Sequence, residues 1–381
     1  MSLPVLLALS TVLHAYIGVR ILPSLPGALP AAALTLLLVL SVLLVPMGMF
    51  ARRLTRPPVA DTLAAIGLLF MGLFSSLLVL TFLRDVLLLL LALVNFAAPS
   101  AIPLRGVKTL SAVAVPAVAL LITLLGYWNA RRTAGVVTVD VPLQGLPAAL
   151  QGFRIVQISD VHVGPTIRRR YIEAIVEAVN RLKPDVIAIT GDLVDGSVAE
   201  LGPHVAPLGK LLSRYGSFFV TGNHEYYSGV LPWLAELQRL GIKVLQNEHV
   251  VIEHGGAQLV LAGVPDYSAG YFEESHRSNP AAALGGAPAT AAAKVLLAHQ
   301  PRTAVAAAQA GFDLQLSGHT HGGQFLPWNF FVKFQQPFTA GLHRLGRMWV
   351  YVSRGTGYWG PPKRFGAPSE ITEIRLVASP V

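Results

Sequence analysis

The stretch FFVTGNHEYY, residues 218–227, raises the question that decides how this chain folds. An apolar run that stops at a glycine is typical of a buried strand followed by a tight turn. The turn delivers Asn223, His224 and Glu225 in succession. Since Asn223 places a neutral oxygen beside the titratable ring of His224, this strand end favours chemistry over packing.

Four other apolar runs also end in polar residues. The runs lie at residues 154–158, 185–190, 295–298 and 314–316. The polar side chains that follow them include Asp160, His162, Asp192, His299, His319 and His321. Ligands of open α/β sheets collect at the carboxyl ends of the strands, so five such ends predict one shared site.

The candidate ligands of this site offer only nitrogen and oxygen atoms. They are Asp160, His162, Asp192, Asn223, His299, His319 and His321. A mixture of imidazole and oxygen suits Mn, Fe, Zn or Co better than Ca. The chain contains no cysteine, which excludes a thiolate-bound metal. Seven ligands are too many for one transition ion, so the set predicts two ions.

The spacing of apolar residues predicts an α/β fold for the second half of the chain. One apolar helical face extends over residues 171–182 and stops before Pro184, which makes a βαβ unit with its flanking runs. Another helix is expected over residues 230–240. Further strand-like runs, with little helix between them, lie at residues 242–245, 250–253, 258–262, 348–352 and 371–377. They imply a second, mixed sheet, and we expect two sheets packed face to face with helices outside.

Residues 1–130 have the composition of a membrane region. They contain no Glu and only two of the twenty acidic residues of the chain, Asp61 and Asp85. Four apolar stretches each approach the ~20 residues that a helix needs to cross a bilayer. These stretches lie at residues 3–18, 28–49, 62–82 and 107–128. We therefore predict about four spans.

A fifth apolar run, residues 86–98, leaves the topology open. It is short for a crossing, and it either extends the third helix or lies re-entrant. With four spans, the basic residues Arg52, Arg53 and Arg56 lie on the same side as Arg131 and Arg132. The positive-inside rule then puts that side, with the catalytic domain, in the cytoplasm. A fifth span would reverse the domain.

The membrane half is interpreted as an anchor rather than a transport path. No Lys, Arg, Asp or Glu lies in the middle of an expected span, where His14 is the one titratable exception. A lone histidine there is more often packed against a neighbouring helix than part of a proton relay. The net charge of +9 is spread over both halves, seven basic against two acidic residues before residue 131 and 22 against 18 after it. A dedicated nucleic-acid binder concentrates its charge, so no nucleic-acid partner is expected.

The strand ends carry the motifs DVH, GDLVDG, GNHE, AHQP and GHTHGG in this order. Together they resemble the signature of the calcineurin-like metallophosphoesterases, over about residues 150–377. The tail RGTGYWGPPKRFGAPSEI, residues 354–371, resembles the branch of that family with an N-terminal membrane region. That branch includes bacterial phosphodiesterases and a lipid-A-pathway UDP-diacylglucosamine pyrophosphatase. The family implies a four-layer α/β/β/α sandwich, preceded here by an all-α transmembrane region.

The resemblance also implies a role for each site residue. One metal would be held by Asp160, His162, Asp192 and His321, and the other by Asp192, Asn223, His299 and His319, with Asp192 as the bridge. Two cations ~3.5–4 Å apart would activate a bridging water as the nucleophile and clamp the phosphoryl oxygens. His224 is not a ligand in this pattern, because the matching histidine points toward the substrate phosphate and the leaving group. His224 and Asp192 are therefore the expected catalytic residues.

These observations predict a division of the chain and a function. We expect a transmembrane helical region at residues 1–130, a linker and first strand at 131–150, and a metallophosphoesterase domain at 151–381. The expected function is that of a multi-pass inner-membrane hydrolase that cleaves a phosphodiester or pyrophosphate bond by metal-activated hydroxide. Anchoring favours a lipid-linked substrate. The alternatives are a tethered phosphodiesterase for soluble nucleotides, and a sensor or transporter whose soluble domain only binds metal.

Overall fold

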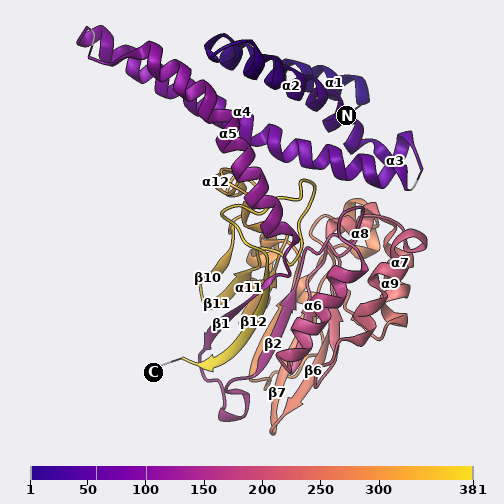
Figure 1. Ribbon diagram of the computed structural model, residues 1–381. Coiled ribbons are helices and arrows are strands. Elements are labelled where there is room, and N and C mark those ends of the chain that lie inside the picture. The colour runs from indigo at the N-terminus through magenta and orange to yellow at the C-terminus, as the bar shows by residue number, and fades with distance from the viewer. Residues whose placement is uncertain (1, 57, 100, 380–381) are drawn as a thin grey trace. The chain divides into compact units, whose positions relative to one another are not determined.

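The computed structural model describes residues 2–56, 58–99 and 101–379, except for the side chain of Arg52. Residue 1 and residues 380 and 381, which the predicted domains include, lie outside this part of the chain. Two compact units are present (Figure 1). The first contains the residues up to Trp128 together with Gly360–Lys363, and the second contains Asn129–Trp359 and the chain from Arg364 onward. The division of the chain at residues 130 and 150 stays a prediction.

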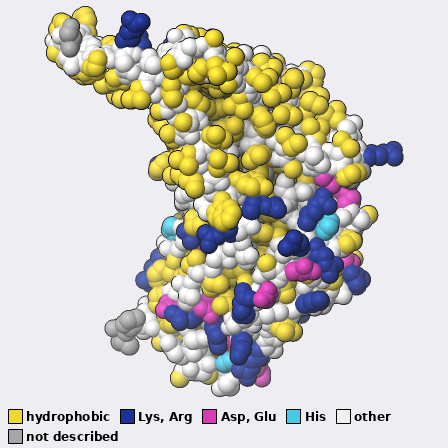
Figure 2. Space-filling model, in the orientation of Figure 1, with side chains coloured by type: hydrophobic (Ala, Val, Ile, Leu, Met, Phe, Trp, Pro, Cys, Tyr) yellow, Lys and Arg dark blue, Asp and Glu magenta, His cyan; other side chains and the backbone are white. Residues whose placement is uncertain are grey.

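The first unit is helical, as its composition predicts. Its long helices are α1 (Leu3–Ile21), α2 (Ala28–Met49), α4 (Val59–Ala97) and α5 (Leu104–Arg131), with the short α3 (Ala51–Leu54) before α4. These four long helices are apolar enough to cross a membrane, which confirms the expected helical region. On the face shown in the space-filling view, hydrophobic side chains cover most of this unit, and the charged side chains gather mainly on the second unit (Figure 2).

Helix α4 corrects the expectation that no charged residue lies in the middle of a membrane span. The fifth apolar run continues the third helix without a break, so α4 has 39 residues and is about 58 Å long. Arg84 and Asp85 therefore lie inside a candidate span rather than between two spans. Their charges have partners, because Arg84 donates to the carbonyl of Arg20 (3.0 Å) and Asp85 accepts from Tyr16 (2.7 Å) and Arg20 (2.8 Å).

Two further polar groups of the first unit have hydrogen-bond partners. His14 is buried, with Nδ1 2.7 Å from the carbonyl of Ser10 and Nε2 2.7 Å from Ser41 Oγ. Lys363, from the C-terminal part of the chain, donates to the carbonyl of Gly72 (2.8 Å) and to Ser76 Oγ (2.5 Å). The first unit is therefore not continuous in sequence.

The second unit contains two six-stranded mixed sheets. The first has the order β1-β12-β2-β3-β4-β5 and the second the order β10-β11-β9-β8-β7-β6 (Figure 1). The strands of the first sheet are β1 (Gly135–Leu143), β2 (Arg154–Ile158), β3 (Val186–Ile189), β4 (Ser217–Phe219), β5 (Lys243–Val244) and β12 (Glu370–Ala378). Those of the second are β6 (Glu248–His254), β7 (Ala257–Gly263), β8 (Ala293–Leu297), β9 (Leu314–Ser317), β10 (Gly341–Leu345) and β11 (Met348–Val352).

Three layers of apolar side chains hold the sheets and helices together. One buried cluster joins the facing sides of the two sheets, with Ile155 from the first and Leu261 from the second. Another covers the outer face of the first sheet with α6 (Arg169–Arg181), α7 (Val198–Val205) and α9 (Val230–Arg239). A third covers the second sheet with α10 (Pro280–Ala283) and α11 (Ala304–Ala310). The expected α/β/β/α sandwich is confirmed.

The partition of strands between the sheets differs from the sequence expectation. Five strand-like runs were expected to form the second sheet. Two of them, residues 242–245 and 371–377, contribute β5 and β12, which belong to the first sheet. Conversely, β8 and β9, which carry two of the five polar strand ends, lie in the second sheet, where β7, β8, β9 and β11 pair in parallel. An apolar run indicates that a strand is buried, but the strand with which it pairs depends on packing across the whole unit.

Candidate metal centre

The seven candidate ligands follow directly on the ends of five strands. These strands are β2, β3 and β4 of the first sheet and β8 and β9 of the second. Five of the seven residues have a positive φ, between 51° and 70°, which is uncommon for a residue with a side chain. They are Asp160, His162, Asp192, His319 and His321. Such backbone strain persists where the surroundings hold it, and it concentrates at functional sites.

Two glycines are required at these strand ends for space. A Cβ on Gly222 would lie 2.2 Å from Asp192 Oδ1, and a Cβ on Gly318 would lie 2.1 Å from Asp160 Oδ2. Any side chain at either position would displace a carboxylate of the site. The glycines of GNHE and GHTHGG therefore let neighbouring strand ends approach each other closely.

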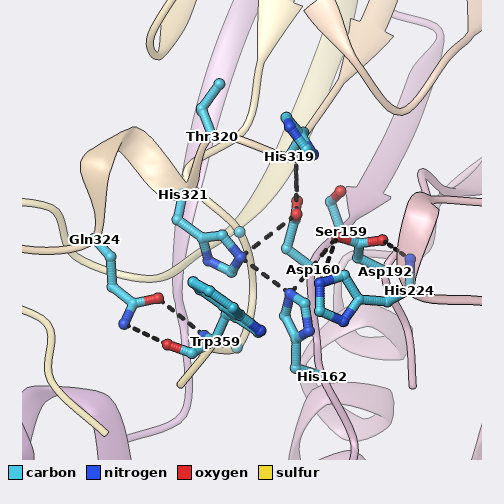
Figure 3. A network of polar contacts seen from close by, with 12 residues as sticks. Ser159, Asp160, His162, Asp192, His224, His319, Thr320, His321, Gln324 and Trp359 are labelled. Carbon is cyan, nitrogen blue, oxygen red and sulfur yellow. Dashed lines mark hydrogen bonds and ion pairs between the residues drawn. The ribbon is translucent and has the colours of Figure 1, made fainter. Parts of the chain in front are cut away.

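The first group of converging atoms comes from Asp160, His162 and His321 (Figure 3). The two imidazole Nε2 atoms are 3.0 Å apart, and His321 Nε2 is 3.6 Å from Asp160 Oδ1. One ligand atom from each residue lies within 4.8 Å of the others. Two ring nitrogens and a carboxylate oxygen that face a common point fit a divalent cation.

The second group comes from Asp192, His299 and His319. His299 Nε2 lies 3.2 Å from Asp192 Oδ2 and 3.2 Å from His319 Nδ1. Asn223 follows β4 between Gly222 and His224, whose backbones both approach Asp192, and its Oδ1 is buried without a hydrogen-bond partner among the described residues. A buried carbonyl oxygen that lacks a donor is costly in an apolar interior, and a cation would satisfy it.

Asp192 connects the two groups. Its Oδ2 is 3.9 Å from His162 Nε2 on one side and 3.2 Å from His299 Nε2 on the other. The fold thus brings the predicted residues to one place, and their nitrogen and oxygen atoms suit two divalent transition ions. The role of each residue as a ligand stays a prediction.

Burial and charge act against each other at Asp192. Burial by itself would raise the pKa of this carboxyl, but the neighbouring His299, His224 and His162 outweigh it and hold the pKa well below its usual range. Asp192 is therefore ionised when the histidines carry protons. A cation in their place would favour the same ionised form.

Asp195 is a site residue that sequence reasoning missed. Its Oδ1 accepts from His162 Nδ1 at 3.0 Å and from His224 Nδ1 at 2.6 Å. Burial lowers the pKa of His224, but the hydrogen bond to Asp195 and the charge of Asp192 outweigh this and raise the pKa to about 9. The signal was the second aspartate of GDLVDG, three residues after Asp192.

Glu225 was also missed, although it belongs to the stretch at residues 218–227. Its carboxylate accepts from the backbone N–H groups of Asp192 (3.0 Å), Leu193 (2.7 Å) and Gly222 (2.6 Å). It therefore fastens the end of β3 to the end of β4. The available signal was the position of Glu225, three residues after Gly222 at the start of the short helix α8 (Asn223–Tyr227), from which a glutamate side chain can reach back to the N–H of the N-cap residue.

Aromatic rings flank His224 on the exposed side of the site. The ring of His224 lies 5.3 Å from that of Tyr227 and 6.0 Å from that of Trp359, and both neighbours are exposed. The side chain of Gln324 holds the backbone of Trp359, because it donates to the Trp359 carbonyl (2.8 Å) and accepts from the Trp359 backbone N–H (2.9 Å) (Figure 3). No sequence pattern marked Tyr227 or Trp359, because each comes near His224 only in the folded unit.

Arg364 lies behind His321 and was not predicted either. Its Nη1 donates to the carbonyl of His321 (2.9 Å), and its Nη2 is 3.0 Å from His321 Nδ1. Burial lowers the pKa of this guanidinium to about 10. Arg364 therefore fixes the orientation of the His321 ring from the side away from Asp160.

Comparison with known proteins supports the resemblance to the calcineurin-like metallophosphoesterases. Residues 153–323 match the family described as calcineurin-like phosphoesterase. A transmembrane protein with metallophosphoesterase domain from Bos taurus is 43% identical over 280 residues, which are 70% of this chain and 63% of that protein. A protein of the same description from Danio rerio is 41% identical over 259 residues, 66% of this chain and 59% of that protein.

A shorter relative is covered more completely. An uncharacterized metallophosphoesterase from Aquifex aeolicus is 33% identical over 225 residues, which are 58% of this chain and 84% of that protein. By contrast, the chain covers less than two thirds of the length of the two vertebrate relatives. The likeness to those two proteins therefore concerns part of each.

Proposed function

The chain belongs to the calcineurin-like metallophosphoesterase family, and from this premise we propose that it is a membrane-anchored phosphoesterase that hydrolyses a phosphodiester or pyrophosphate bond. The observation that supports this most directly is that six of the seven candidate ligands converge, and that the seventh, Asn223, has a buried Oδ1 without a donor among the described residues. When bound there, two divalent ions would lower the pKa of a water molecule and withdraw charge from the phosphoryl oxygens.

His224 is the residue that we propose as the proton donor to the leaving group. Its Nδ1 is held by Asp195, so the ring has a fixed orientation and Nε2 faces the site, 3.9 Å from Asp192 Oδ2. The side chain of His224 is also more exposed than that of His162, which reaches the same carboxylate of Asp195. A proton placed on the departing oxygen by a general acid typically contributes about 10²–10⁴ in rate.

The aromatic rings beside His224 bear on the substrate. Since the leaving group must approach His224, it would come close to the rings of Tyr227 and Trp359. Exposed rings there favour a leaving group with an apolar or planar body. We propose a lipid-linked phosphodiester or pyrophosphate as the substrate, because the chain also has four candidate membrane spans. A soluble nucleotide is the second candidate, since a base can stack on the same rings.

We also propose that the second unit lies in the cytoplasm, with the first unit in the cell membrane. Four helices return the chain to its starting side, which then carries Arg53, Arg56 and Arg131. A reporter fused to the C-terminus should behave as cytoplasmic. Alkaline phosphatase activity from a periplasmic fusion at that point would contradict this orientation.

The deciding experiment uses the full chain purified in detergent, with bis(p-nitrophenyl) phosphate as the substrate. Turnover should depend on added Mn and should disappear after chelation. A protein that carries its metals but turns over neither this ester nor a lipid-linked pyrophosphate would favour the sensor or transporter. A direct comparison of lipid-linked pyrophosphates with nucleotides then separates the two substrate candidates.

A further inference from the structure

The second unit exposes a group of large apolar side chains close to the metal centre. We call Leu326, Trp328, Phe330, Phe331 and Phe334 the aromatic patch, and each is between 41% and 77% exposed. The rings of Trp328 and Phe331 are 5.7 Å apart, and those of Phe331 and Phe334 are 6.3 Å apart. Single exposed apolar residues are ordinary on soluble proteins, but a contiguous group marks an interaction surface.

The segment that carries the aromatic patch is held in place. It contains the short helix α12 (Asn329–Val332), and the N–H of Leu326 donates to the carbonyl of Phe365 (2.9 Å). At the other end, Arg302 donates to the carbonyl of Gln335 (2.7 Å), and the buried side chain of Gln336 donates to Gln300 Oε1 (3.1 Å). The rings are thus displayed by a fixed segment whose two ends are anchored in the second unit.

We propose that the aromatic patch docks on the surface of an anionic lipid bilayer. Trp and Phe beside a cation are the side chains that interfacial protein segments carry. Lys333 lies within the patch, with Nζ 5.8 Å from the centre of the Phe334 ring. The chain itself would tether the second unit to a bilayer, because only residues 132–134 lie between helix α5, a candidate membrane span, and strand β1.

The charge around the patch favours lipid over a second copy of the chain. Residues 314–369 contain no Asp or Glu, and three of their basic residues, Lys333, Arg344 and Arg347, are exposed, whereas Lys363 and Arg364 are buried. Two such surfaces would repel each other, whereas anionic headgroups attract basic side chains near the membrane. Docking would insert the rings about 5–10 Å into the headgroup region.

The patch is also connected to the metal centre through a close backbone approach. A Cβ on Gly323, the last residue of the turn His321–Gly323, would lie 2.2 Å from the Cα of Asn329 in α12. The ligand candidate His321 and the aromatic patch are therefore parts of one rigid segment. Docking of the patch would bring the metal centre to the lipid interface, where a lipid-linked phosphate is found.

The test uses the absence of cysteine from the chain, which allows a single fluorophore to be attached to the full-length protein. Phe330→Cys places it in the patch. Leu212→Cys is the matched control, because Leu212 is an exposed apolar residue before β4, at the opposite end of that strand from Asn223. Both proteins are reconstituted in vesicles of phosphatidylcholine and phosphatidylglycerol, and quenching is measured with a nitroxide lipid and with iodide in the water.

We expect the nitroxide lipid to quench the label at residue 330 several-fold more than the label at residue 212, and iodide to show the reverse order. Adding Phe334→Asp to Phe330→Cys should remove most of the lipid quenching, whereas adding Leu212→Asp should not. Equal exposure of both labels to iodide would overturn the proposal. So would a label at residue 330 that neither quencher reaches, which would indicate a protein partner or a second copy, and so would lipid quenching that survives Phe334→Asp. None of these readouts depends on catalysis, so the proposed reaction is tested separately.

Discussion

The two units both bury polar side chains, but they satisfy them in different ways. In the first unit, both ring nitrogens of His14 have partners within hydrogen-bonding distance, Ser10 and Ser41. In the second unit, the Nε2 atoms of His162 and His321 face each other at 3.0 Å, and Asn223 Oδ1 is buried without a donor among the residues described. The ring of His14 is fully paired within the first unit, while the side chains of the site in the second unit converge on a point that another atom must occupy.

Hydrogen-bond satisfaction is therefore a physical criterion that distinguishes buried polar side chains that stabilise the fold from those that bind a ligand. A polar group whose partners are all present stabilises the fold and has no capacity left for a ligand. A set of buried donors and acceptors that converge without mutual satisfaction is stable only when a ligand completes it. Histidine in a membrane helix and histidine after a strand are therefore assigned different roles, and substitutions in each unit test this assignment.

The largest effect is expected for Asp192→Ala. Because Asp192 lies between the two groups of ligand atoms, its loss should reduce the metal content and bring turnover to the level of chelated protein. Metal analysis of the purified protein and kcat on bis(p-nitrophenyl) phosphate measure both effects. Asp140→Ala is the control, since Asp140 pairs with Arg375 at the exposed surface. An Asp192→Ala protein with full metal content would show that Asp192 is not needed to hold the metals.

His224→Ala should keep the metals and lose catalysis. If His224 delivers a proton to the leaving group, kcat should fall by about 10²–10⁴ on an alkyl ester. The loss should be smaller on a p-nitrophenyl ester, whose leaving group is already a good anion. His343→Ala, at a histidine whose Nε2 contacts the carbonyl of Ala340, should change neither quantity. Loss of a metal from His224→Ala would instead assign His224 as a ligand.

Asp195→Asn should have an intermediate effect. The amide oxygen of Asn can still accept from both His162 and His224, but it lacks the negative charge that strengthens these two hydrogen bonds. Residues that orient a metal ligand in this way typically contribute about 10–100-fold to metal affinity or activity. Metal titration together with kcat measures the change, and Asp140→Asn is the matched control. A variant with unchanged metal affinity and kcat would show that Asp195 does not position the two histidines.

The smallest effect is expected in the first unit, for His14→Phe. The variant loses the contact with Ser41, and hydrogen bonds between membrane helices contribute on average about 0.6 kcal/mol. The thermal midpoint in detergent should fall slightly, while metal content and kcat per folded molecule stay the same. Ser41→Ala should reproduce the shift because it removes the same contact. A large loss of turnover in either variant would mean that the buried polar groups of the first unit take part in the chemistry.

Much of the site could be predicted from the sequence because its residues follow short strands that are mostly apolar and buried. The five runs and their polar ends are local features, and six of the seven candidate ligands come together in the fold. Asp195 and Glu225 lie inside the same motifs but were missed, because their contacts with His162, His224 and the backbone of Asp192 cross from one strand end to another. Sequence spacing does not report such contacts.

The aromatic surroundings of the site were beyond sequence reasoning for a similar reason. Trp359 lies 135 residues after His224 in the chain, and its position depends on the side chain of Gln324. The exposure of Phe330 and Phe334 also emerges only when the rest of the second unit is in place, since an apolar segment of that length could as well be buried.

The sequence by itself determined the family, the apolar helices of the first half and the order of polar strand ends, since each depends on residues close together in the chain. The tertiary structure decided which strands share a sheet, and it made the third and fifth apolar runs one helix that contains Arg84 and Asp85. It also decided which buried polar atoms are left for a ligand. Hydrogen-bond satisfaction is a property of three-dimensional neighbours, so Asn223 could be recognised as incomplete only after its surroundings had been built.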